Sequence, residues 1–372
     1  MHYSSCFKRH LRFSLLQRRL VISRQFNSST TTTTTSSSNS RVVDVSGLAQ
    51  RMRDSVRRYT LQQEVRMVAV LAQSDSLLRE DAEVYSHNIA EAFAEDGLHY
   101  EVCSCSGDEP AAVEEAIRYL NQRSDVHGIL VFYPIFKTRN LDDKGLYLNQ
   151  RTGVHYKTYD DYLRDVVSPQ KDVEALSQVH TRGAQHLFRA RGMDHAGEDP
   201  YVPCTALAVS KIMEEYYKPL HNSNNSKSSR KWLGHTVTVV NRSEILGRPL
   251  AGLLSLQGAT VYSVDEDSIL VFEEDGRLRR CNNMELKDCI GQSSVIVSGV
   301  PTSDFSLPMD EIQPGTMVID VSEGSCNVEE DVLLQKPSVQ LVSNVGKVTV
   351  AALEQNLIRL HQQQRNLNLI LE

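Results

Sequence analysis

The chain has 372 residues, enough for two ordinary domains, and its 40% hydrophobic and 23% charged content is usual for globular enzymes. No run of about 18 apolar residues occurs, which argues against a membrane span. The seven scattered cysteines show no repeated spacing and follow no secretory leader, so we interpret them as reduced thiols rather than a disulfide framework.

Charge is unevenly distributed along the chain. Residues 1–43 contain seven Lys or Arg and no acid, so the remainder carries 33 basic and 47 acidic residues, a net charge of −14. An acidic body repels phosphate polymers, which argues against nucleic-acid binding. Arg and apolar residues mix at residues 10–26 as in organellar transit peptides, and the Ser/Thr tract at 28–40 predicts disorder. We expect a leader to the mitochondrial matrix within residues 1–43; a plastid leader and an untargeted cytoplasmic tail are the alternatives.

Strand and helix patterns alternate over the first half of the chain. Apolar β-branched runs predict buried strands, and apolar residues at helical spacing predict helices between them. The predicted elements are a strand at 65–71, a helix at 82–95, a strand at 98–103, a helix at 110–120 and a strand at 128–133. This order predicts a parallel sheet with helices on both faces. We interpret residues 73–84 as a long loop and the polar stretch 137–165 as a surface insertion.

The alternation restarts after Pro203. Thr205 is the expected cap of the first helix, and a polar loop is expected at residues 222–230. The predicted elements are a helix at 205–216, strands at 235–240, 259–264, 294–298, 316–321 and 339–342, a helix at 245–256 and a closing helix at 348–362. The βαβ unit with further strands predicts a doubly wound nucleotide-binding domain.

The first βα turn of that domain runs from Asn241 through Arg242 and Ser243 to Gly247. In dinucleotide folds, backbone amides of this turn approach the pyrophosphate. The fingerprint GxGxxG is absent, so this motif leaves a dinucleotide and a different ligand both open. Asp265 ends the next strand, where an acid binds the ribose hydroxyls and repels a 2′-phosphate; this favours NAD over NADP, with a turn cap as the alternative. Arg242 argues the other way, because a guanidinium can bind a 2′-phosphate or the pyrophosphate.

Four sequence blocks carry a resemblance to a known family. They are KDVEAL (171–176), PCTALAV (203–209), VVNRSEILGRPLAGLLSLQGATVYSVD (239–265) and GKVTVAAL (346–353). The chain resembles the methylenetetrahydrofolate dehydrogenase/cyclohydrolase family over residues 44–360, in particular its monofunctional NAD-dependent branch. The resemblance implies a two-lobed α/β fold, a cleft for folate between the lobes, and a homodimer. Its implied parts are a folate domain (44–202), an NAD-binding Rossmann-like domain (203–346) and a closing helix (347–372) that returns to the first lobe.

The resemblance also assigns site residues. The family's cyclohydrolase chemistry uses a Tyr, a Lys four residues later, a Gln and an Asp, and these positions fall here on Tyr85, Ile89, Phe132 and Glu174. Ile89 and Phe132 cannot transfer protons, so the cyclohydrolase step should be absent or very weak. Tyr85 and Glu174 are the predicted catalytic residues. Tyr85 would be a platform for the aromatic part of folate, with a packed core Tyr as the alternative, and Glu174 would bind pterin donors or stabilise the product cation.

The remaining predicted contacts follow from position in the resembling blocks. Folate is expected to contact Phe132, Pro203, Gly346 and Thr349, and NAD to contact Arg248, Val300 and Pro301 besides the turn. No metal site is expected. The predicted reaction is oxidation of 5,10-methylenetetrahydrofolate by hydride transfer to NAD, which needs positioning more than a protein base. A bifunctional dehydrogenase/cyclohydrolase and a silent nucleotide-binding scaffold are the alternatives.

Overall fold

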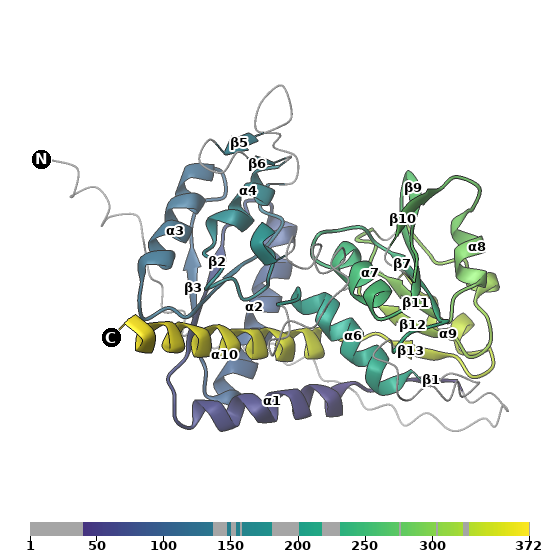
Figure 1. Cartoon of the computed structure of the whole chain (residues 1–372), viewed down its shortest axis with the longest axis horizontal. Coiled ribbons are helices and arrows are strands. Elements are labelled where there is room, and N and C mark those ends of the chain that lie inside the picture. Colours follow the sequence, from purple (N-terminus) through teal and green to yellow (C-terminus); the bar gives the residue numbers. More distant parts are fainter. Residues whose placement is uncertain are drawn as a thin grey trace, which may run out of the picture.

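The computed structural model describes residues 40–136, 147–149, 154–156, 158–180, 201–217, 231–274, 277–302, 304–322 and 327–371. These residues form two α/β lobes, with the long helix α10 (Val345–Leu371) running from the second lobe across the first (Figure 1). The two-lobed α/β fold expected from the sequence is confirmed. Most of the predicted leader and the loop at 222–230 lie outside the described residues.

The first lobe contains a parallel sheet in the order β3-β2-β4, formed by His99–Ser104, Arg66–Leu71 and Gly128–Val131. Successive side chains of β2 point to opposite faces, as a strand requires. Met67 and Ala69 pack in the core shared with α2 (Ser76–Asp96), whereas Val68 packs against α3 (Pro110–Gln122). Helices therefore cover both faces of the sheet, as its apolar strands predicted.

Two interpretations of polar stretches in this lobe were wrong. The segment predicted as a long loop (73–84) is helical from Ser76, because the Asp75 carboxylate caps α2 by accepting from the amides of Leu77 and Leu78 at 3.0 and 3.1 Å. The segment 137–165, predicted as a surface insertion, contributes buried residues to the core at its C-terminal end, while residues 137–146, 150–153 and 157 lie outside the described residues. It includes the hairpin β5 (Tyr147–Asn149) and β6 (Val154–Tyr156) and most of α4 (Tyr159–Val166), whose Tyr162 and Leu163 are buried.

The second lobe is built on an eight-stranded sheet in the order β1-β13-β12-β11-β7-β8-β9-β10. Its first six strands are parallel: Arg41–Val42, Gln340–Val342, Met317–Asp320, Val295–Ser298, Thr236–Val240 and Thr260–Asp265. The antiparallel hairpin of β9 (Ser268–Phe272) and β10 (Leu278–Cys281), which the pattern did not predict, extends one edge. Helices α6 (Cys204–Tyr216) and α7 (Gly247–Leu256) cover one face; α8 (Leu286–Gly291), α9 (Glu330–Leu333) and a short turn at Met309–Glu311 cover the other.

Secondary structure is present before the expected boundary at residue 43. Arg41 and Val42 pair in parallel with Gln340 and Leu341, so β1 is an edge strand of the second lobe and the end of the predicted leader segment is folded. An edge strand satisfies backbone groups that β13 would otherwise expose. Helix α1 (Ser46–Thr60), also unpredicted, then returns to the first lobe.

Helix α10 ties the lobes together by packing against both α1 and α6. A buried charge cluster adds to this contact. Arg53 and Arg57 of α1 each place Nε 2.6 Å from one oxygen of the buried Asp96 of α2, and Arg53 lies 3.5 Å from Glu354 of α10. Three helices that wall the interlobe cleft are thereby joined. Among the described helices, none is both long and apolar enough to cross a bilayer.

Ser338 at the turn before β13 has a φ of +58°, a backbone conformation that disfavours any residue with a Cβ. We expect Ser338→Gly to raise the free energy of unfolding by about 0.5 to 1 kcal/mol, because relief of the strain exceeds the added freedom of glycine in the unfolded chain. Urea unfolding would measure it. Ser338→Ala, which keeps the Cβ, is the matched control; an equal gain in that variant would contradict the strain argument.

Candidate active site in the interlobe cleft

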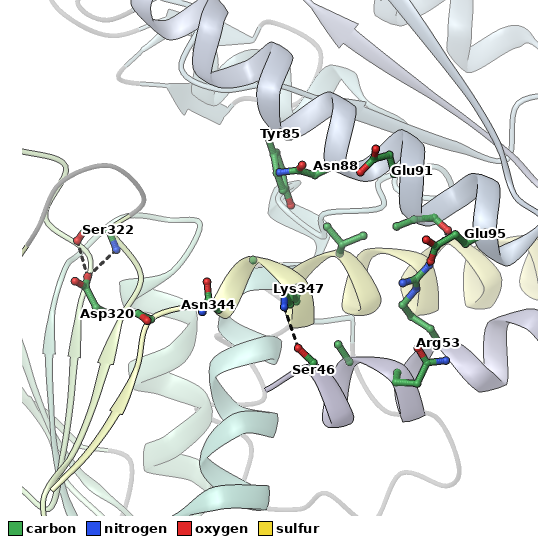
Figure 2. Close-up of a pocket in the computed structure, with 16 residues that line it drawn as sticks. Ser46, Arg53, Tyr85, Asn88, Glu91, Glu95, Asp320, Ser322, Asn344 and Lys347 are labelled. Carbon is green, nitrogen blue, oxygen red and sulfur yellow. Dashed lines mark hydrogen bonds and ion pairs between the residues drawn. The ribbon is translucent and has the colours of Figure 1, made fainter. Parts of the chain in front are cut away.

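Two adjoining pockets lie in the cleft, and both are lined by Tyr85 and Gly346. The larger has a volume of about 910 Å³ and is walled by α1, α2, the start of α10 and the ends of β12 and β13 (Figure 2). Its side chains come from both lobes: Tyr85, Asn88 and Glu91 project from α2, and Asp320 lies across the opening (Figure 2). The cleft that the resemblance implied is therefore present.

The smaller pocket, of about 250 Å³, brings together most of the predicted folate contacts. Its lining includes Tyr85, Phe132, Glu174, Gly346 and Thr349, which come from four separate segments of the chain. It also includes residues that the sequence did not point to, namely Val131, Tyr133, Thr205, Ile245, Val321 and Val345.

The remaining predicted contact, Pro203, is buried and lies just before α6, which begins at Cys204 with no side-chain cap. The prediction that Thr205 caps this helix was wrong: Thr205 is in its first turn and lines the smaller pocket.

One face of α2 forms a wall of the cleft. Tyr85, Asn88 and Glu91 follow one another at three-residue intervals, which places them on one side of a helix. The ring of Tyr85 meets Phe132 edge to face, with centroids 6.2 Å apart. Ile89 is fully buried in the core and lines neither pocket, and α2 contains no Lys at any position.

The carboxyl group of Glu174 lies in the smaller pocket in an environment that disfavours its charge. Burial, and secondarily the negative charge of Asp172, raise the pKa of Glu174 to about 8, against an opposing effect of Arg164. Asp172 is itself buried and accepts a hydrogen bond from the amide of Ser177 at 2.7 Å. Near neutral pH, Glu174 is therefore largely protonated in the free protein.

The residue after Glu174, Ala175, has a φ of +56° and is fully buried. This left-handed backbone conformation turns the chain directly after Glu174. Burial of the Ala175 methyl group contributes about 0.8 kcal/mol and offsets part of the backbone strain. Glu174, the residue before this turn, lines the smaller pocket.

The turn after β7 is organised by Asn241. Its Oδ1 accepts from the amides of Ser243 and Gly247 at 2.8 and 3.2 Å, and its Nδ2 donates to the carbonyl of Gly299 at 2.7 Å. A Cβ added at Gly247 would lie 2.0 Å from the Asn241 carbonyl oxygen, so only glycine fits there. The single glycine of the motif thus permits a close backbone approach at the N-terminus of α7.

Arg242 and Asp265 lie together at the carboxyl ends of β7 and β8. The Arg242 guanidinium donates to the carbonyl oxygens of Ser263 and Ser268 and to the Ser268 hydroxyl at 2.6 to 2.7 Å. Its side chain is only 10% exposed, whereas that of Asp265 is 51% exposed and 3.6 Å from it. The acid therefore faces solvent where a ribose would lie, and the cation is held behind it.

The other predicted cofactor contacts occupy the same edge of the sheet. The backbone of Val300 exchanges hydrogen bonds with the buried Asn327 at 2.9 and 3.1 Å, which fixes the loop after β11. Pro301 is exposed beside it. Arg248 is half exposed and paired with Glu244 at 2.9 Å. Together with the Asn241–Gly247 turn and Asp265, these residues fit an NAD molecule lying across the carboxyl ends of parallel strands.

Cys204 provides no alternative chemistry. Cys204 is buried, donates to the carbonyl of Val173 at 3.3 Å, and burial raises the pKa of its thiol well above the usual value, so it is a core residue and not a nucleophile. In the part of the chain that the structure describes, no three His, Cys, Asp or Glu side chains gather as metal ligands would.

This combination of a two-lobed α/β fold, a reaction pocket in the cleft and a dinucleotide turn on the second lobe defines a two-domain nicotinamide-dependent oxidoreductase. The comparison with known sequences is more specific. The chain belongs to the tetrahydrofolate dehydrogenase/cyclohydrolase family: its catalytic domain matches residues 43–148 and its NAD(P)-binding domain matches residues 203–365. The predicted family is therefore confirmed.

Relatives and solved structures agree with this assignment. The chain is 35% identical over 331 residues to methylenetetrahydrofolate dehydrogenase [NAD(+)] of Dictyostelium discoideum, covering 87% of this chain and 94% of that protein. For the Schizosaccharomyces pombe enzyme of the same name, identity is 32% with coverage of 81% and 86%. The structure of the NAD-dependent 5,10-methylenetetrahydrofolate dehydrogenase from Saccharomyces cerevisiae gives a TM-score of 0.71 at 28% identity, covering 90% and 99% of the two chains. A bifunctional enzyme from Thermoplasma acidophilum, 17% identical with a TM-score of 0.60 and coverage of 88% and 100%, shares the fold.

Proposed function

We propose that this chain oxidises 5,10-methylenetetrahydrofolate to 5,10-methenyltetrahydrofolate with NAD as the hydride acceptor. The relatives from Dictyostelium and the two yeasts are named for an NAD-dependent methylenetetrahydrofolate dehydrogenase. The observation that carries the proposal is the composition of the smaller pocket. It joins Tyr85, Phe132 and Glu174 of the first lobe to Ile245, a residue of the dinucleotide turn. A folate held by the first lobe would thus meet the nicotinamide end of a cofactor held by the second.

The chain's own residues contribute position and charge. Bound NAD supplies the hydride acceptor. Tyr85 offers a ring face to the aromatic part of folate, and Glu174 accepts hydrogen bonds from the pterin. Loss of hydride leaves positive charge on the folate, which an ionised Glu174 stabilises. Because only a hydride leaves in this step, no protein base has to remove a proton. The larger pocket has room for the remainder of the folate molecule.

We further propose that the chain does not catalyse hydrolysis of the methenyl product. That step needs a group that moves protons around a water molecule. Phe132 in the smaller pocket cannot do so, and α2 carries no Lys. Lys347 lines the larger pocket, where its Nζ donates to the Ser46 hydroxyl at 2.9 Å (Figure 2), and it is not among the residues that line the smaller pocket with Phe132. These observations favour a monofunctional dehydrogenase over a bifunctional enzyme.

Purified full-length protein given methylenetetrahydrofolate should reduce NAD and leave NADP nearly unreduced, because the exposed Asp265 repels a 2′-phosphate. Absorbance at the nicotinamide band measures this. Methenyltetrahydrofolate added to the same protein should decay no faster than in buffer. Reduction of neither cofactor would refute the dehydrogenase in favour of a silent scaffold, and accelerated decay would establish the bifunctional alternative.

We propose that residues 1–43 contain a leader to the mitochondrial matrix, supported by their seven basic and no acidic residues. Because β1 begins at Arg41, processing should retain that residue. Import into isolated mitochondria followed by N-terminal sequencing would test this; a chain left unprocessed outside the organelle would contradict it.

We also propose a homodimer, on the basis of the family resemblance. Analytical ultracentrifugation should give about twice the monomer mass of 41.9 kDa. A species at the monomer mass across micromolar concentrations would contradict the proposal.

A further inference from the structure

The selectivity of a dinucleotide site for NAD or NADP depends on the charges that meet the 2′ position of the adenosine ribose. A 2′-phosphate needs a cation, and an acid at the end of the second strand repels it. This chain has both groups, since Arg242 and Asp265 lie 3.6 Å apart at the ends of β7 and β8. Which of them faces the ligand decides the outcome.

The hydrogen bonds of Arg242 settle its direction. Both Nη atoms donate to strands β8 and β9: Nη1 to the Ser268 hydroxyl at 2.7 Å, and Nη2 to the carbonyls of Ser263 and Ser268 at 2.7 and 2.6 Å. To turn fully toward a 2′-phosphate, the guanidinium would have to give up these hydrogen bonds. Hydrogen bonds to a charged group are stronger than those between neutral groups, so this movement is costly.

Ser268 supplies two of the three acceptors and is the first residue of the antiparallel strand β9. That strand follows directly on the turn that carries Asp265, and Asp265 pairs with Ser268 in the β8–β9 ladder. One short turn therefore presents the acid outward and holds the cation inward.

We propose that Ser268 is a specificity-determining positioning residue, whose hydroxyl and carbonyl hold the Arg242 guanidinium beneath the β8–β9 turn and so withhold it from a 2′-phosphate. NAD selectivity then has two components: repulsion by Asp265 and retention of Arg242. Removing Asp265 alone converts the site only in part, because the cation stays bound to Ser268.

The test compares Asp265→Ser with Asp265→Ser/Ser268→Ala in the full-length protein. Calorimetry with adenosine 2′,5′-bisphosphate and adenosine 5′-monophosphate reports recognition of the 2′-phosphate and needs neither folate nor turnover. The inference rests on the proposed use of NAD, but this binding readout is separate from dehydrogenase activity, so the two can fail independently. We expect the second substitution to lower the Kd of the bisphosphate about tenfold, because the guanidinium no longer gives up a hydrogen bond to the Ser268 hydroxyl when it binds the phosphate. The Kd of the monophosphate should stay unchanged.

Two further variants make the result specific. Asp265→Ser/Ser268→Thr keeps the hydroxyl on a residue that suits a strand and should bind like Asp265→Ser. Adding Arg242→Gln to the double variant should abolish the gain. The proposal is overturned if Asp265→Ser alone binds the bisphosphate as tightly as the double variant, if both nucleotides weaken together, or if the gain survives Arg242→Gln. That last result would assign the cation to Arg248 or to Arg280 of β10, whose Nη2 lies 3.5 Å from the Asp267 carbonyl oxygen.

Discussion

Replacing Glu174 by Gln should lower kcat/KM for methylenetetrahydrofolate by about 100-fold, the usual effect of removing one group that stabilises charge in the transition state. Gln keeps the shape and one acceptor oxygen but cannot carry the negative charge that opposes the developing folate cation. Because burial and Asp172 raise the pKa of Glu174 to about 8, the ionised form predominates only above that pH. In the wild-type protein, kcat/KM should therefore rise with pH through about 8, and in Glu174→Gln this rise should be absent.

The same substitution should stabilise the protein at high pH. The folded-state pKa of Glu174 lies above its ordinary value of 4.5, so the folded protein binds this proton more tightly than the unfolded chain does. The contribution of Glu174 to stability is thus lost progressively as pH rises from about 4.5 to beyond 8. Gln has no proton to lose, so Glu174→Gln should gain in melting temperature relative to the wild type between pH 6 and pH 9.

Two controls separate charge from shape at this position. Glu174→Asp retains a carboxylate and should keep a pH-dependent rate. Asp172→Asn removes the second cause of the raised pKa and should move the inflection in kcat/KM to lower pH. An unchanged rate in Glu174→Gln would show that this carboxyl group does not act on the reacting folate.

Substituting Gly247 by Ala should weaken NAD binding about 100-fold, as displacements of about 1 Å in a preorganised site do. The new Cβ would lie 2.0 and 2.4 Å from the carbonyl oxygen and carbon of Asn241 and 2.8 Å from the Arg242 nitrogen. All three are backbone atoms, so the turn must open. The hydrogen bond from the Gly247 amide to Asn241 would then be lost, and with it the alignment of amides at the start of α7.

Titration of NADH fluorescence would measure this affinity, and thermal unfolding would measure the accompanying loss of stability. Gly291→Ala is the matched control: it lies in the same lobe, and a Cβ there would meet nothing nearer than Glu311 at 3.9 Å. Gly291→Ala should bind NADH as the wild type does. Normal affinity in Gly247→Ala would mean that the cofactor does not depend on this turn.

The sequence by itself determined the fold class and most of its elements. Buried parallel strands such as β2 and β7 are short apolar β-branched runs, and amphipathic helices such as α3 have an apolar stripe, so both are visible in local pattern. It also determined the family, because four motifs lie in the family's order. The short edge strand β1 was not predicted from the sequence, because two residues beside a polar tract are too few to show the alternation of apolar and polar residues that marks a strand. Helix α1 had a signal in Leu48, Met52 and Val56, but its many charges and its place after the leader obscured it.

Only the tertiary structure decided which residues meet in the cleft and how their charges act. Tyr85, Glu174 and Ile245 come from distant segments, and Ile245 enters the smaller pocket only because α10 and α6 hold the lobes together. The raised pKa of Glu174 depends first on burial in the cleft, which the sequence does not show, and secondarily on Asp172, its neighbour two residues back. The sequence left Arg242 able to favour either cofactor. Its direction is fixed by the Ser268 hydroxyl together with the carbonyl oxygens of Ser263 and Ser268, groups that only the path of the strands brings within reach of a guanidinium.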